Sequence, residues 1–110
     1  MAQNFRRYVA RNIGTSASTI FTADSYDTVI GVGVANTTGS QVFVDVYIND
    51  VDSSNDVYLI KNAPVVSGGS LELIDGGSKI VLASGDQLFV KSDTASSLDT
   101  VVGAVDDIST

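Results

Sequence analysis

An all-β fold is predicted by three features of the 110-residue sequence. The apolar residues are mostly valine, and good helix formers are scarce, with a single glutamate in the whole chain. Short stretches in which apolar and polar residues alternate recur along the chain, with no helical periodicity. Ten glycines and many Ser, Thr, Asn and Asp residues supply turns between them. These features predict an antiparallel β-sandwich, or a jelly-roll-like barrel, of eight or nine short strands.

The first three expected strands occupy residues 6–13, 18–22 and 28–36. The first, RRYVARNI, is interpreted as an extended arm or an edge strand. The third, TVIGVGVAN, alternates so that Ile30, Val32 and Val34 are expected to share one face. Its other face carries one valine followed by three small residues, which predicts the close approach of another backbone or a large side chain. These four residues are Val29, Gly31, Gly33 and Ala35.

The most regular stretch is QVFVDVYIN, residues 41–49. Its period of two predicts one face in the core and one partly wet face. The expected core residues are Val42, Val44, Val46 and Ile48, and the expected outer residues are Phe43, Asp45 and Tyr47. A polar turn at 50–56 separates this strand from its expected hairpin partner, VYLIK at 57–61.

The C-terminal half is expected to hold four more strands, at 71–74, 79–82, 87–92 and 98–105. Residues 62–70 are interpreted as a connection, because Pro64 cannot donate a hydrogen bond in a central strand. DGGS at 75–78 and ASGD at 83–86 supply turns, and the DDIST tail is expected to fray. The length fits one domain, with residues 1–13 as a basic arm or edge strand and residues 14–110 as a single β-sandwich.

Composition excludes several classes of function. The chain has no cysteine and no histidine, so disulfides, thiolate metal sites and the usual general base at neutral pH are absent. A net charge of −7 repels phosphate backbones, which argues against nucleic-acid binding. No apolar run is long enough for a signal peptide or a membrane span, so synthesis in the cytoplasm is expected.

One loop offers a weak candidate metal site. The carboxylates of Asp50, Asp52 and Asp56 lie two to four residues apart in NDVDSSND, and calcium prefers such oxygen ligands. The EF-hand template fails twice, because Asn55 stands where a glycine is needed and Lys61 where a bidentate glutamate is needed. The favoured interpretation is a hairpin loop whose side chains bond their own backbone, and no metal or cofactor is expected.

No enzyme is predicted. Neither DGGSK at 75–79 nor GVGVAN at 31–36 has the spacing of a phosphate-binding loop. The carboxylate pairs Asp50/Asp52 and Asp106/Asp107 fall in an expected loop and tail, where nothing would raise one pKa. The serines have no base, and no tryptophan forms a sugar platform, so no small-molecule substrate is expected.

The basic residues are distributed unevenly. Three arginines precede residue 12, whereas three lysines and all thirteen acids follow it, a net charge of −10 (3 − 13) for that part. The segment is either an ordinary strand with solvated arginines or a strip that pairs with carboxylates of a partner. The candidate partner-binding residues are Phe5, Arg6, Arg7, Tyr8 and Arg11, types enriched at protein interfaces.

A family resemblance covers almost the whole chain. It is carried by FRRYV…NIGTS, by VIGVGVANTTGS followed by VDVYI, by YLIKNAPVVSGGSLEL and KIVLASGDQLFVKSD, and by a closing SSLDTVV. In their order and residue patterns these stretches resemble small virion structural proteins of tailed bacteriophages, particularly cyanophages. The resemblance implies a non-enzymatic β-sandwich built into the particle, commonly a homotrimer.

The leading hypothesis is therefore a capsid decoration, or cement, protein that binds the shell exterior and stabilises it by non-covalent contacts. Its expected partners are the major capsid protein or other virion proteins, and its expected location is the virion. A small neck, tail or baseplate component is the nearest alternative. A carbohydrate- or calcium-binding module is a further one, centred on the loop at 50–56.

Overall fold

The chain folds into nine β-strands in a computed structural model that describes residues 4–23, 27–52, 54–73 and 80–106. The strands are β1 (Asn4–Ile13), β2 (Ser18–Thr22), β3 (Asp27–Asn36), β4 (Val42–Asp50), β5 (Asn55–Val65), β6 (Ser70–Glu72), β7 (Ile80–Leu82), β8 (Gln87–Ser92) and β9 (Leu98–Asp106). Within these ranges no helix is long and apolar enough to cross a membrane. The expected turn at 75–78 and the tail beyond residue 106 lie outside the described residues.

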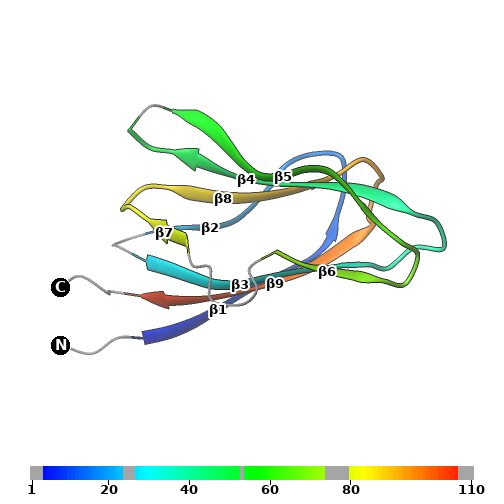
Figure 1. Cartoon of the computed structure of the whole chain (residues 1–110), viewed down its shortest axis with the longest axis horizontal. Helices are drawn as coiled ribbons and strands as arrows, with labels where there is room; N and C mark the ends of the chain where they lie inside the picture. The colour runs from blue at the N-terminus through cyan, green and yellow to red at the C-terminus, as the bar shows by residue number, and fades with distance from the viewer. Residues whose placement is uncertain (1–3, 24–26, 53, 74–79, 107–110) are drawn as a thin grey trace.

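Two antiparallel sheets face each other (Figure 1). Sheet A has the order β1-β9-β3-β6, with β7 also paired to β3, and sheet B has the order β2-β8-β4-β5. Because β6 and β7 pair with different parts of β3, they act together as one interrupted strand. Counted so, the two sheets hold four strands each, in the topology of a jelly roll. The predicted fold class is confirmed.

The core lies between the sheets and is built mainly from valine. Val32, Val44, Val46, Val90 and Val102 have no exposed surface. Burying each such side chain stabilises the fold by roughly 1.5–3 kcal/mol. The alternation predicted for β4 is confirmed at its start, where the valines are buried and Phe43 is 38% exposed on the outer face.

A β-bulge overturns one predicted face. Ile30 was expected to share the core face with Val32 and Val34, but it is 40% exposed whereas Val29 is buried. The register between β3 and β9 shifts between Val29 and Gly31, so the extra residue reverses the in–out pattern there. A strict period of two cannot anticipate such an inserted residue.

Strand β5 is longer than predicted. The expected connection at 62–70 begins only after Val65, and Pro64 is paired with Phe43 inside the strand. Because β5 is the last strand of sheet B, the missing N–H of this proline can face outward at no cost to the ladder. The predicted strands at 18–22 and 87–92 match β2 and β8.

Candidate interaction surface on sheet A

The outward face of sheet A begins at β1, where alternate side chains point to opposite sides. Tyr8 and Ala10 pack toward the core, and the ring of Tyr8 stacks on Phe21 of sheet B. Arg7, Val9 and Arg11 therefore project outward. Val9 is 58% exposed, and both arginines are exposed.

Small residues form the floor of this face. Register pairs place Val9 beside Val101, Val101 beside Gly33, and Gly33 beside Glu72, which makes one row across four strands. The next row runs from Asp99 through Ala35 to Ser70. Because glycine and alanine have little or no side chain, their position between larger neighbours leaves a depression at the centre of the sheet surface.

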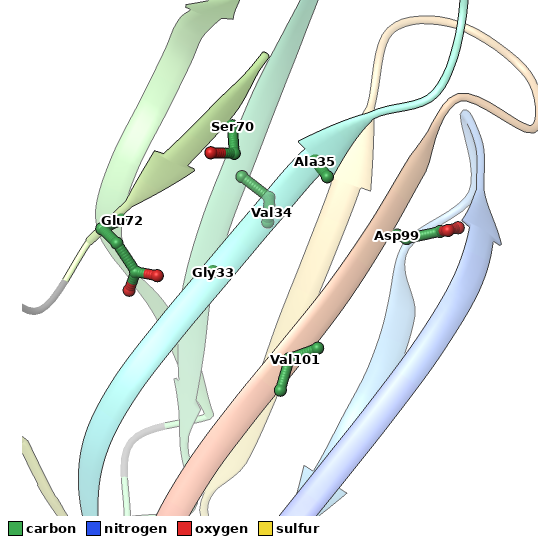
Figure 2. Close-up of a pocket in the computed structure, with 7 residues that line it drawn as sticks. All are labelled: Gly33, Val34, Ala35, Ser70, Glu72, Asp99 and Val101. Atoms are coloured by element: carbon green, nitrogen blue, oxygen red, sulfur yellow. The ribbon is translucent and has the colours of Figure 1, made fainter. Parts of the chain in front are cut away.

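Two open hollows result, of about 230 and about 300 Å³. The first lies over β3, β6 and β9, and Figure 2 shows Glu72, Ser70, Asp99 and Val101 around it. The second lies between β1 and β9 and is bordered by Val9 and Arg11. Both are lined by Asp99 and Val101, so they lie side by side on the sheet, and the two hollows together are termed the sheet A trough.

The face is apolar for an exposed surface. Val9, Val81 and Val101 each expose more than half of their surface, and Ile30 exposes 40%. The bulge in β3 brings Ile30 to this side, where it approaches Gly103. A cluster of exposed aliphatic residues on one sheet face is typical of an interaction surface.

Charges of both signs border the trough, at opposite sides. Arg7 and Arg11 stand on β1, and the Glu72 carboxylate lies over Gly33 near β6. A Cβ at position 33 would come within 3.0 Å of a Glu72 oxygen, so glycine there leaves room for the carboxylate. Asp99 is partly engaged, because its Oδ1 accepts a hydrogen bond of 3.1 Å from the backbone N–H of Asn12.

The five predicted partner-binding residues all lie on β1 but do not share one face. Arg11 lines the trough and Arg7 is exposed on the same side of β1, whereas Tyr8 packs inward. Arg6 is exposed and pairs with Ala104 in the ladder. The backbone of Phe5 pairs with Val105, and its side chain lies outside what the structure describes. Residues 4–13 thus form an edge strand of the sandwich.

Sequence reasoning did not single out Val101, Gly33 or Glu72 as site residues. The small face of residues 28–36 was a usable signal for Gly33. No local pattern links Val101 or Glu72 to that strand, because their proximity depends on the sheet order. Long-range strand pairing of this kind is set by topology, and alternation within a single strand does not specify it.

The candidate calcium loop is held by its own hydrogen bonds. The Asp50 Oδ1 accepts from the N–H of Asp52 at 3.1 Å, and the Asp56 Oδ1 accepts from the side chain of Asn49 at 3.0 Å. Among the described residues, no group of three or more acidic side chains is placed to hold a metal ion.

The outer face of sheet B carries an aromatic cluster. Tyr47 lies 4.9 Å from Tyr58 and 5.2 Å from Phe89, measured between ring centroids. These neighbours bury Tyr47, which was expected on a partly wet face. Burial, followed by the nearby charge of Asp56, raises the pKa of the Tyr47 phenol. The Lys61 ammonium lies 4.8 Å from the Tyr58 ring and covers one side of the cluster.

Comparison with known proteins finds similarity in fold only. No protein-family model and no curated protein sequence matches the chain. One similar solved chain belongs to a structure of infectious bursal disease virus, Gx strain, with a TM-score of 0.54 and 10% identity. Another is a pentameric capsid protein isolated from metagenomic phage sequences, with a TM-score of 0.50 and 19% identity.

The similarity extends over most of this chain but over less of the others. It covers 96% of this chain and 34% of the bursal disease virus chain. It covers 92% of this chain and 60% of the phage capsid protein. The chain therefore spans about a third of the length of the bursal disease virus chain and three fifths of the length of the phage capsid protein. These observations define the fold of the chain as a jelly roll that is similar to parts of these two viral proteins.

Proposed function

We propose that this chain is a non-catalytic structural protein of a phage virion that binds the outside of the capsid as a decoration protein. The observation that carries the proposal is the jelly-roll fold, which is similar over nearly the whole chain to a phage capsid protein. In this chain the edge of sheet A is the basic strand β1.

The contact with the shell is assigned to the free edge of β1. Among the residues that the structure describes, this strand pairs with β9 on one side and is the last strand of sheet A on the other. An edge strand can extend its ladder onto an extended segment of a neighbouring protein. Arg6, Arg7 and Arg11 add guanidinium groups that pair with carboxylates in a bidentate geometry.

The charge distribution suits such a role. The net charge of −10 after residue 11 keeps a protein made in many copies soluble before assembly. The basic strand then directs the docking of an otherwise acidic molecule. Sites on the shell that present acidic segments are the partners that fit this strand.

Co-sedimentation with capsids tests the proposal. Capsids are purified from the phage that encodes the chain and stripped of accessory proteins, and the purified chain is added back. We expect saturable binding that weakens with salt and falls about tenfold in an Arg6→Gln/Arg7→Gln variant, because two charged contacts are removed. Lys61→Gln/Lys91→Gln is the matched control, since it removes equal charge from sheet B.

Absence of binding by the wild-type chain would overturn the decoration role. Binding that is equal in both double variants would overturn the assignment of the contact to β1. Binding to isolated tails in place of heads would identify the chain as a tail component.

A further inference from the structure

We propose that a second copy of the chain docks face to face on the sheet A trough, about a two-fold axis that runs along the strands. The inference concerns contacts between copies and goes beyond the proposed function. It uses Arg7 and Arg11, two of the three arginines assigned to the shell, so a copy docked on its partner meets the shell through Arg6 and the backbone edge of β1. The resemblance to phage virion proteins implies a homotrimer, whereas the residues of this face favour a pair.

The face is large enough for a specific contact. The three long strands β1, β9 and β3 and the short strands β6 and β7, about 4.8 Å apart with a rise of about 3.3 Å per residue, cover roughly 550 Å². Two such faces remove on the order of 1,100 Å² from water, close to the lower end of specific protein interfaces. The exposed Val9 and Val101 supply its apolar centre.

The shape of the face is self-complementary under this axis. The sheet order β1-β9-β3-β6 reverses across the two-fold, so β9 faces the partner's β3 and β1 faces the partner's β6. Val101 then lies over the hollow at the partner's Gly33, and the reverse contact repeats on the other side. Opposed sheets pack in this manner with their strands rotated by roughly 30°.

The charges on the face favour a two-fold axis along the strands over one that runs across them. In the same arrangement, Arg7 and Arg11 of β1 approach the partner's Glu72, and the two-fold axis repeats this cluster of opposite charges once more in the pair of copies. An axis across the strands would instead place β1 on the partner's β1 and bring arginines onto arginines. Like charges in that position are repelled, so the axis along the strands is favoured.

The arginines and Glu72 of one copy cannot form this pair within the chain. Strands β9 and β3 lie between β1 and β6, so the two edges are three strand spacings, or about 14 Å, apart. Any coupling between these positions must therefore arise between copies. This makes a charge exchange across two separate variants a specific test.

One variant carries Arg7→Glu and Arg11→Glu, and the other carries Glu72→Arg. All three side chains are exposed, so each variant should fold, which circular dichroism checks. Native mass spectrometry and sedimentation equilibrium then measure association. We expect a dimer for the wild type and a dissociation constant raised about tenfold or more for each variant alone, because every pair becomes like-charged.

Mixing the two variants should restore association near the wild-type strength. In the mixed dimer the two glutamates introduced on β1 of one copy face the arginine introduced on β6 of the other, and the unchanged pair remains on the opposite side. The heterodimer has its own mass, which separates it from both homodimers. Restored association in the mixture cannot arise from contacts within a single chain, because each variant alone carries only one of the two changes.

An apolar substitution supplies an independent readout. Val101→Gln should weaken the dimer about tenfold, whereas Val57→Gln should leave it unchanged. Val57 is the matched control, since it is 53% exposed against 54% for Val101 and lies on the edge strand of sheet B. A monomeric wild type, a trimer or larger ring, variants that associate normally, or a mixture that stays monomeric would each overturn the proposal.

Discussion

The ring of Tyr8 lies parallel to the ring of Phe21, with 4.2 Å between their centroids and 7° between their planes. Tyr8 belongs to β1 at the edge of sheet A, and Phe21 belongs to β2 at the edge of sheet B. The stack therefore joins the two sheets along one side of the sandwich. It fixes the basic edge strand to the body, together with the backbone pairs between β1 and β9.

The first prediction concerns this stack. Tyr8→Ala should lower the free energy of unfolding by about 2–4 kcal/mol, because it removes apolar burial and an aromatic contact. A double-mutant cycle with Phe21→Ala should give a coupling of about 1 kcal/mol. Val9→Ala, which changes an exposed neighbour on the same strand, should cost less than about 1 kcal/mol. Equal costs at positions 8 and 9 in urea unfolding would disprove the role given to the stack.

The second prediction concerns Asn36, a buried polar residue at the end of β3. Its side-chain nitrogen donates to the backbone oxygens of Ser40 at 2.8 Å and Val65 at 2.9 Å, and its oxygen accepts from Thr38. Asn36→Ala should destabilise the protein by about 2–3 kcal/mol, because buried backbone groups lose their partners. Gln41→Ala, at an exposed position nearby, should stay within about 0.5 kcal/mol of the wild type. Chemical denaturation of both variants checks this difference.

The third prediction concerns pH. The pKa of Tyr47 is raised from its ordinary value of 10.0, first by burial and then by the charge of Asp56, so the folded protein favours the neutral phenol. The stability that this contributes is fully present below the ordinary pKa and is lost as the pH rises through the folded pKa. Tyr47→Phe should therefore lose less stability than the wild type as the pH rises above about 10. Parallel loss in both proteins would contradict the effect.

The fourth prediction concerns calcium. Adding calcium or a chelator should leave the melting temperature unchanged, because the carboxylates of Asp50 and Asp56 already accept hydrogen bonds from their own loop. A ligand that binds only the folded state would raise the melting temperature. A rise with calcium that Asp52→Asn abolishes would revive the calcium-binding alternative.

The fold class was predictable because it depends on local pattern. The valines of β4 and the composition of the turns identify an all-β chain, and β2 and β8 begin and end at the residues predicted for them. The face of Ile30 was not predictable, because a bulge adds one residue without a distinctive sequence. The length of β5 was missed since Pro64 is tolerated in an edge strand, and edge position is a property of the whole sheet.

The candidate surface was only partly accessible to sequence reasoning. The arginines of β1 stood out by charge, and the small residues of β3 by pattern. Their meeting with Val101 and Glu72 depends on β9 and β6 flanking β3, which requires the jelly-roll order. The inward direction of Tyr8 likewise depends on a partner, Phe21, that belongs to the other sheet.

The most direct test of the virion proposal is a cryo-electron microscopy reconstruction of particles of the phage that encodes this chain. The proposal predicts regularly spaced density on the outer surface of the head that fits this jelly roll, with β1 directed toward the shell. Particles that lack the chain, or that carry it only in the tail, would contradict its assignment as a capsid decoration protein.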